Sequence, residues 1–151
     1  MPSRPKILLV DDNPGDVHLT MMALRLAKFG EVVDHVIDGL EALEHLRANV
    51  ATASSHKVSL VLADINMPRM NGRELLARIK SDITLRHIPV VMLTTSQSEH
   101  EAISCYERGA SLVLTKHVDF DAFLGVIQEL KDFWETCICG GGGLTPDAGE
   151  A

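Results

Sequence analysis

The chain has 151 residues, of which 46% are hydrophobic and 23% charged, a balance typical of one folded globular domain. Its net charge of −7 argues against nucleic-acid binding, which requires a basic face. No apolar stretch approaches the roughly 20 residues needed to cross a bilayer, and no signal peptide is recognisable. We therefore expect a cytoplasmic protein without membrane contact.

Short apolar runs rich in Val, Ile and Leu alternate with amphipathic segments along the chain. The runs predict strands at residues 6–10, 31–36, 60–64, 88–93 and 112–115. Helices are expected at residues 13–29, 39–48, 72–81 and 98–108 and from residue 119 onward, and Gly30 is the predicted stop of the first. This alternation predicts an α/β fold: a doubly wound, five-stranded parallel sheet in the flavodoxin-like order 2-1-3-4-5, with helices on both faces.

The chain divides into one domain and a short tail. Residues 1–139 are assigned to the domain, which includes a polar loop at residues 49–57 that is longer than a simple connection needs. From Gly140 onward the sequence is rich in glycine and has the composition of a flexible linker. Residues 140–151 are therefore predicted to be disordered.

Polar residues follow four of the apolar runs at the point where each run ends. They are Asp11 and Asp12 after the first run, Asp64 at the third, Thr94 at the fourth and Lys116 at the fifth. Because ligands bind at the carboxyl ends of parallel strands, we expect these side chains to converge there. Carboxylates bind Mg²⁺ and can attack phosphorus, and a hydroxyl and an ammonium can stabilise phosphoryl oxygens. The pattern predicts a site for a divalent cation and a phosphoryl group.

These residues and the segments around them resemble the receiver domain of two-component response regulators. The resemblance covers about residues 5–136. The matching segments are Ile7-Leu8-Leu9-Val10-Asp11-Asp12, Asp64-Ile65-Asn66-Met67-Pro68-Arg69-Met70-Asn71-Gly72, Pro89-Val90-Val91-Met92-Leu93-Thr94-Thr95, and Gly109-Ala110-Ser111 leading to Lys116.

The resemblance implies a phosphoacceptor and a set of metal ligands. Asp64 would accept the phosphoryl group, and Asp12 would bind Mg²⁺ directly. Asp11 would bind the metal directly or through water, and the main-chain carbonyl of Asn66 would complete the ligands together with Asp64. The implied protein is a single-domain response regulator. It accepts a phosphoryl group from a sensor histidine kinase, signals through partner or dimer contacts, and is not a turnover enzyme.

Two further site residues have implied roles, and two positions depart from the family pattern. Thr94 would be the switch hydroxyl and Lys116 the phosphate-facing ammonium. Receivers usually have proline after this lysine, but His117 follows here, and Val113 occupies the position of the switch aromatic of many receivers. A rotating aromatic cannot transmit the signal there. The alternatives are movement of the fourth strand and helix with Thr94, or a change in dimer geometry.

A narrower resemblance concerns the partner. The ending Lys131-Asp132-Phe133-Trp134-Glu135, the long loop before the third strand and residues 81–89 look like single-domain regulators paired with phytochrome-type histidine kinases. This implies a photoreceptor kinase as phosphodonor and a tendency to dimerise.

The last predicted helix is apolar on more than one face. One stripe, formed by Phe120, Phe123, Ile127, Leu130 and Trp134, has the spacing of a core-facing helix. Val126 and Phe133 lie seven residues apart on a neighbouring face, which is either a broad extension of the core or an interface. The fifth strand, at the edge of the sheet, has no protecting charges. We expect a homodimer formed through this strand and the last helix.

Two other functions match parts of the pattern. A phosphohydrolase that forms an aspartyl-phosphate would need a second acid two residues after its nucleophile. Asn13 and Asn66 occupy those positions after Asp11 and Asp64. A pseudo-receiver, used only as an interaction module, would not require the acidic and basic site residues, all of which are present.

Overall fold

The five apolar runs pair into a single parallel sheet. The computed structural model describes residues 6–29, 32–52, 57–67, 69–95 and 99–139. The strands are β1 (Lys6–Val10), β2 (Val32–Val36), β3 (Leu60–Asp64), β4 (Val90–Thr94) and β5 (Leu112–Thr115). Their spatial order is β2-β1-β3-β4-β5 and every neighbouring pair is parallel. The predicted strand order is confirmed.

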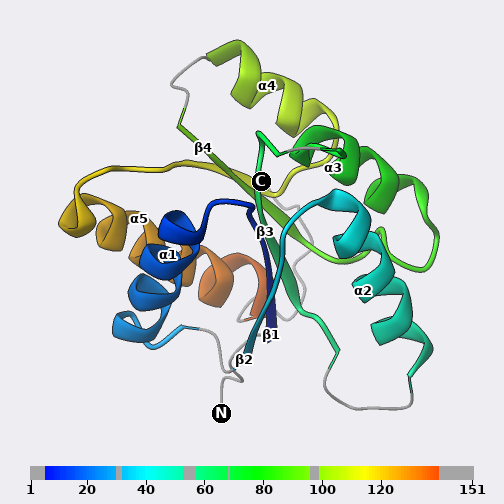
Figure 1. Ribbon diagram of the computed structural model, residues 1–151, viewed down its shortest axis with the longest axis horizontal. Coiled ribbons are helices and arrows are strands. Elements are labelled where there is room, and N and C mark those ends of the chain that lie inside the picture. The colour runs from blue at the N-terminus through cyan, green and yellow to red at the C-terminus, as the bar shows by residue number, and fades with distance from the viewer. Residues whose placement is uncertain (1–5, 30–31, 53–56, 68, 96–98, 140–151) are drawn as a thin grey trace.

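Helices cover both faces of this sheet (Figure 1). They are α1 (Pro14–Leu26), α2 (Gly39–Ala51), α3 (Gly72–Ser81), α4 (Glu99–Glu107) and α5 (Phe120–Phe133), and α5 continues as a π-helical segment (Trp134–Cys139). Helices α1 and α5 lie on one face, and α2, α3 and α4 lie on the other. No helix within the described residues is long and apolar enough to span a bilayer.

Alternate residues of the central strands supply the two halves of the core. In β1, Leu8 and Val10 pack with helices α2 and α3, and Ile7 and Leu9 pack with helices α1 and α5. All four side chains are fully buried. A strand with both faces covered must be apolar at every position, which explains the unbroken hydrophobic runs of the sequence.

Helix α1 ends earlier than predicted. The expected end was about Phe29, with Gly30 as the stop, but the last helical residue is Leu26 and Gly30 lies outside the described residues. Lys28 takes a left-handed backbone conformation with φ of 56°, and the Phe29 N–H donates to the Leu24 carbonyl at 2.9 Å. This hydrogen bond belongs to a Schellman cap, in which Phe29 also packs with Leu24 in the core. Lys28, and not Gly30, is therefore the residue whose left-handed conformation ends the helix.

Helix α2 is longer than predicted. It continues to Ala51, beyond the expected end at residue 48, so the first part of the predicted loop is helical. The Lys57 ammonium donates to the carbonyl oxygens of Asn49 and Val50 at 2.9 and 3.1 Å. A positive charge on the free carbonyls of the last turn stabilises a helix end. The rest of the predicted loop, residues 53–56, and the predicted disordered tail, residues 140–151, lie outside the described residues.

The loop after β3 is fixed against the start of α2. The Asp38 carboxylate is fully buried and accepts a hydrogen bond from Arg69 Nε at 2.7 Å. The Gly39 N–H donates to the Met70 carbonyl at 3.1 Å. These contacts join the first turn of α2 to the segment that follows Asp64.

Helix α3 begins in direct contact with the backbone of that loop. Asn71 and Glu74 form a capping box at the helix start, and the Gly72 N–H donates to the Ile65 carbonyl at 2.8 Å. A Cβ atom at Gly72 would lie 2.8 Å from Ile65 Cα and would also overlap the Asp64 carbonyl oxygen. Glycine is therefore required at this position by the close approach of helix and strand end.

We predict opposite stability effects for two glycine substitutions. Gly72→Ala should lower the free energy of unfolding by about 1–3 kcal/mol, because backbone atoms must shift to admit the methyl group. Gly125→Ala, in the exposed face of α5, should raise it by about 0.5–1 kcal/mol, since nothing described lies within 4 Å of the added Cβ. Urea denaturation of the two variants measures both effects. Equal stability of the two would contradict the packing argument.

Candidate functional site

Three carboxylates meet at the carboxyl ends of the neighbouring strands β1 and β3. Asp11, Asp12 and Asp64 each present an oxygen, and these oxygens all lie within 4.8 Å of one another. Asp11 and Asp64 are buried, and Asp12 is exposed. The sequence predicted this convergence from the strand ends, and the structure places the three side chains together.

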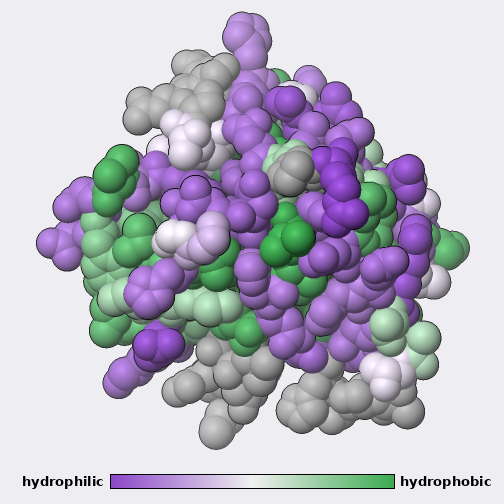
Figure 2. Space-filling model, viewed as in Figure 1, coloured by the Kyte–Doolittle hydropathy of each residue, from purple (hydrophilic) through white to green (hydrophobic). Residues whose placement is uncertain are grey.

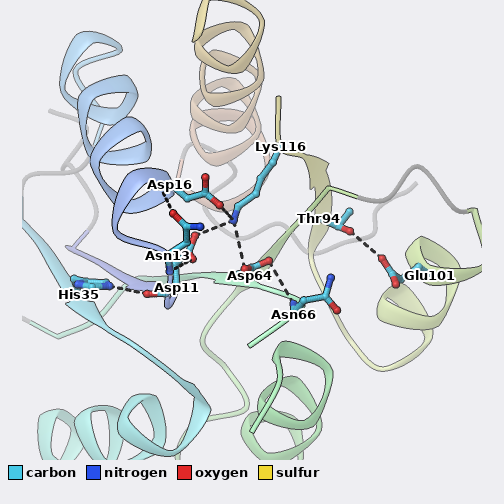
Figure 3. Close-up of polar contacts among 9 residues, drawn as sticks. All are labelled: Asp11, Asn13, Asp16, His35, Asp64, Asn66, Thr94, Glu101 and Lys116. Carbon is cyan, nitrogen blue, oxygen red and sulfur yellow. Dashed lines mark hydrogen bonds and ion pairs between the residues drawn. The ribbon is translucent and has the colours of Figure 1, made fainter. Parts of the chain in front are cut away.

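Asp11 is held by hydrogen bonds from β2 and from the start of α1. Its N–H donates to the Val36 carbonyl at 3.1 Å, and its own carbonyl oxygen lies 2.8 Å from His35 Nε2. A carbonyl can only accept, so His35 Nε2 is the donor. Asp11 Oδ1 accepts from the Asn13 N–H at 2.9 Å, which leaves Oδ2 facing the interior of the site (Figure 3).

Lys116 reaches the same carboxylates from the end of β5. Its N–H donates to the Thr94 carbonyl at 2.8 Å, which places it beside the end of β4. The ammonium donates to Asp11 Oδ2 at 2.9 Å and to Asp16 Oδ2 at 2.7 Å, and it lies 3.4 Å from Asp64 Oδ2. Burial alone would lower the pKa of Lys116, but the hydrogen bonds to Asp16 and Asp11 raise it overall. The side chain therefore stays charged at physiological pH.

Asp64 lies in an environment that disfavours its charged form. Burial is the largest cause and raises its pKa to about 6, the neighbouring Asp11 adds to the rise, and the Lys116 charge opposes it. The Asn66 N–H lies 3.4 Å from Asp64 Oδ1 and only weakly stabilises the charged form of Asp64. A further positive charge beside Asp64 would therefore be favourable.

The donor set fits a hard divalent cation. Carboxylate oxygens are the ligands that Mg²⁺ and Mn²⁺ prefer, and three of them converge from two strands. Three negative charges face a single ammonium within this cluster, so a bound cation would relieve their mutual repulsion. Asp11, Asp12 and Asp64 could hold such an ion. The backbone of Asn66, the fourth expected ligand, lies next to Asp64.

Thr94 is turned away from the three carboxylates. It lies buried at the end of β4, and its hydroxyl donates to Glu101 Oε1 in helix α4 at 2.8 Å (Figure 3). Glu101 in turn lies 3.6 Å from an Arg73 guanidinium nitrogen in helix α3. The predicted switch hydroxyl is therefore connected to two helices on the same face of the sheet.

Two acidic residues of this region were missed by the sequence analysis. Neither Asp16 nor Glu101 was given a part in the predicted site. Asp16 lies in the first turn of the helix that starts just after Asp11 and Asp12, so an acid there could have been expected near the site. Glu101 depends on the path of the segment between β4 and α4, for which the sequence carries no signal.

An open cleft adjoins the site on the side of α1 and the β5–α5 connection. It has a volume of about 400 Å³ and is lined by Asp16, Leu19, Thr95, Lys116, His117 and Val118. Val118 is fully exposed. Figure 2 shows apolar side chains interrupting the polar surface on this side of the molecule, over α1 and α5. The cleft gives solvent access to Lys116.

Comparison with known proteins agrees with this fold. The family model of the response regulator receiver domain matches residues 7–128. The chain therefore belongs to the response regulator receiver domain family, the signalling modules of two-component systems.

Individual relatives show which members of the family this chain resembles. Response regulator Rcp1 of Synechocystis sp. is 35% identical over 128 residues, which cover 85% of this chain and 87% of Rcp1. The crystal structure of the phosphorylated cyanobacterial phytochrome response regulator RcpA is 36% identical, with a TM-score of 0.77, and the match covers 89% of this chain and 96% of RcpA. The Mn²⁺-bound crystal structure of Rcp1 is 33% identical, with a TM-score of 0.73, and the match covers 89% and 98% of the two chains. The chain thus resembles single-domain regulators over nearly their whole length.

The raised pKa of Asp64 predicts a pH-dependent gain in stability for Asp64→Asn. The folded protein keeps a proton on Asp64 up to about pH 6, whereas an unfolded aspartate loses it near pH 4, so stability falls as the pH rises through this window. In metal-free buffer, Asp64→Asn should raise the free energy of unfolding by about 1–2 kcal/mol at pH 7.5 and by less than half of that at pH 4.5.

Urea denaturation with a chelator at both pH values measures this difference. Asp121→Asn, which removes an exposed carboxylate from the first turn of α5, is the control and should show no such pH dependence. An equal gain for Asp64→Asn at both pH values would contradict the assigned cause.

Proposed function

We propose that the protein is a phosphoacceptor in a two-component relay, in which a sensor histidine kinase transfers a phosphoryl group to Asp64 in a Mg²⁺-dependent reaction. One observation carries the proposal. Asp64 is buried at the carboxyl end of a central strand, between two carboxylates suited to a cation and an ammonium 3.4 Å from its Oδ2. A purely structural module would not require this combination, and a phosphohydrolase would also need a second acid two residues after Asp64, where the chain has Asn66.

The chemistry is an in-line displacement at phosphorus. A carboxylate oxygen of Asp64 attacks, the O–P bond forms as the N–P bond of the donor phosphohistidine breaks, and the leaving imidazole takes up a proton. Mg²⁺ held by Asp11, Asp12, Asp64 and the Asn66 carbonyl would supply positive charge to the phosphoryl oxygens. Lys116 supplies a second positive charge. The protein acts only in its own phosphorylation and dephosphorylation and is not a turnover enzyme.

Signal output in this proposal starts at Thr94. A phosphoryl group on Asp64 offers a strong acceptor for the Thr94 hydroxyl, which now donates to Glu101 at 2.8 Å. Turning Thr94 toward the phosphoryl group would break this hydrogen bond. Thr94 would then no longer contact the Glu101–Arg73 ion pair, which joins α4 to α3. The contacts of α4 and α3 would change, which alters the surface offered to a partner or a second copy of the chain.

We propose a phytochrome-type histidine kinase as the phosphodonor. RcpA, with which this chain shares 36% identity, is a phytochrome response regulator, and its structure is that of the phosphorylated form. The match covers 89% of this chain and 96% of RcpA, so the support extends to the whole domain.

We further propose a homodimer through β5 and α5. Val126 and Phe133 of α5 are only half-buried, as are Leu112 and Val113 of β5. The Val113 N–H already donates to the Tyr106 hydroxyl of α4 at 3.0 Å, so this part of the strand edge is occupied. The proposed contact is therefore made by apolar side chains and not by pairing of two β5 strands.

The phosphoacceptor assignment predicts the behaviour of two variants. Incubation with acetyl phosphate and Mg²⁺ should add one phosphoryl group to the wild type, and Asp64→Asn should abolish the gain because it lacks the nucleophile. Asp12→Ala should lower the initial rate at least about tenfold, because a metal ligand is lost. Intact-mass spectrometry follows both, with Asp121→Asn as a control. Undiminished phosphorylation of Asp64→Asn would contradict the proposal.

The dimer predicts a sedimentation difference. Phe133→Asp should shift the protein to a monomer at micromolar concentration, because the substitution places a charge in an apolar contact. Ile83→Asp, at an exposed position between α3 and β4, is the matched control and should sediment like the wild type. Melting curves of both variants verify folding. A wild-type monomer with and without the phosphodonor would contradict the dimer.

A further inference from the structure

The shortest hydrogen bond of the Lys116 ammonium leads away from the three clustered carboxylates. Lys116 Nζ lies 2.7 Å from Asp16 Oδ2, 2.9 Å from Asp11 Oδ2 and 3.4 Å from Asp64 Oδ2 (Figure 3). Asp16 belongs to α1 and Lys116 follows β5, so this ion pair joins segments one hundred residues apart. The lysine is nearly buried, with 8% of its side chain exposed, whereas 38% of the Asp16 side chain is exposed.

Asp16 differs from Asp11 and Asp64 because it can keep its hydrogen bond to Lys116 when a cation binds. The Asp11 carboxylate accepts from Lys116 and also belongs to the cluster suited to a cation, so the ammonium and a cation compete for this carboxylate. Asp16 is not a member of that cluster. Of the two carboxylates that accept hydrogen bonds from Lys116, only Asp16 lies outside the metal cluster. Lys116 therefore stays attached to α1 when a divalent cation binds.

We propose that Asp16 is a positioning residue for phosphoryl transfer: it holds the Lys116 ammonium toward α1, and its charge competes with the phosphoryl group on Asp64 for that ammonium. The proposal rests on the proposed function of Asp64. Asp16 thereby weakens the hold of the site on the phosphoryl group and shortens its lifetime. The Asp16 carboxylate thus makes the phosphorylated state shorter-lived.

Electrostatics gives the direction of the effect. Asp16 and Asp64 both contact the Lys116 ammonium. Removing the Asp16 charge lowers the repulsion of an anion bound at Asp64 and strengthens the pairing of that anion with Lys116. Asparagine keeps the shape of Asp16 and can still accept a hydrogen bond from the ammonium, so Asp16→Asn removes the charge and retains the anchor. We expect about three- to tenfold tighter binding of an anionic phosphoryl mimic, the size typical of one partly screened charge at this range.

The test uses beryllium trifluoride in the presence of Mg²⁺ as the phosphoryl mimic. Fluorine NMR titration of the full chain gives its affinity for wild type, Asp16→Asn, Asp16→Glu and Asp121→Asn. Asp121 is exposed in the first turn of α5, so its substitution matches the loss of one helix-start charge. A second readout is the half-life of the phosphorylated protein after removal of acetyl phosphate, followed by intact mass.

The expected result is tighter binding and a longer half-life in Asp16→Asn, with Asp16→Glu and Asp121→Asn within about twofold of wild type. Rescue by glutamate separates a charge effect from a structural one. Unchanged or weaker binding in Asp16→Asn, or an equal gain in Asp121→Asn, would overturn the inference while the proposed function stands. Failure of the wild type to bind the mimic, or equal binding by Asp64→Asn, would overturn both. Should Asp16→Asn fail to fold, Asp16→Ser provides the same comparison with a smaller acceptor.

Discussion

An excess of buried negative charge at the carboxyl edge of the sheet is the constraint on which the site depends. Asp11 and Asp64 are withdrawn from water and face each other across one ammonium, and Asp12 and Asp16 add two more charges at the rim. Such a cluster is costly unless positive charge is held there. The molecule supplies it through Lys116, whose own burial is tolerated only because carboxylates surround it. The remaining deficit is what makes the site suited to a cation.

The parallel sheet holds these charges in place. Register pairs Asp64 with Leu93 and Thr94 with Thr115, so the polar residues begin where β3, β4 and β5 leave the core together. A slip of one residue in β3 toward the core would carry the Asp64 carboxylate between the two apolar layers and away from Lys116, which costs free energy because the charge would be buried without a partner. The polar strand ends thus fix where the site begins, and helix α3 approaches the Asp64 backbone closely at Gly72.

The sequence predicted the parts of the molecule that follow from local pattern. Apolar runs located the five strands, and the position of Asp11, Asp12, Asp64 and Lys116 at strand ends predicted their convergence. The end of α1 was predicted wrongly, because a Lys28 cap in the left-handed conformation is stabilised by tertiary packing of Phe29 and not by local propensity. Asp16 and Glu101 were missed for a similar reason. Their partners lie across the fold or beyond a loop, where sequence spacing gives no distance.

The two donors expected to meet a phosphoryl group are both engaged elsewhere in this state. Lys116 donates to Asp16 in α1, and Thr94 donates to Glu101 in α4. Each of these acceptors is a carboxylate on a helix, so a phosphoryl group on Asp64 would have to outcompete one charge on each face of the sheet. Its success would loosen α1 from β5 on one face and α4 from β4 on the other. A single group at the sheet edge would then be sensed by both helical layers, because the same two hydrogen bonds that hold the resting state are the ones it must replace.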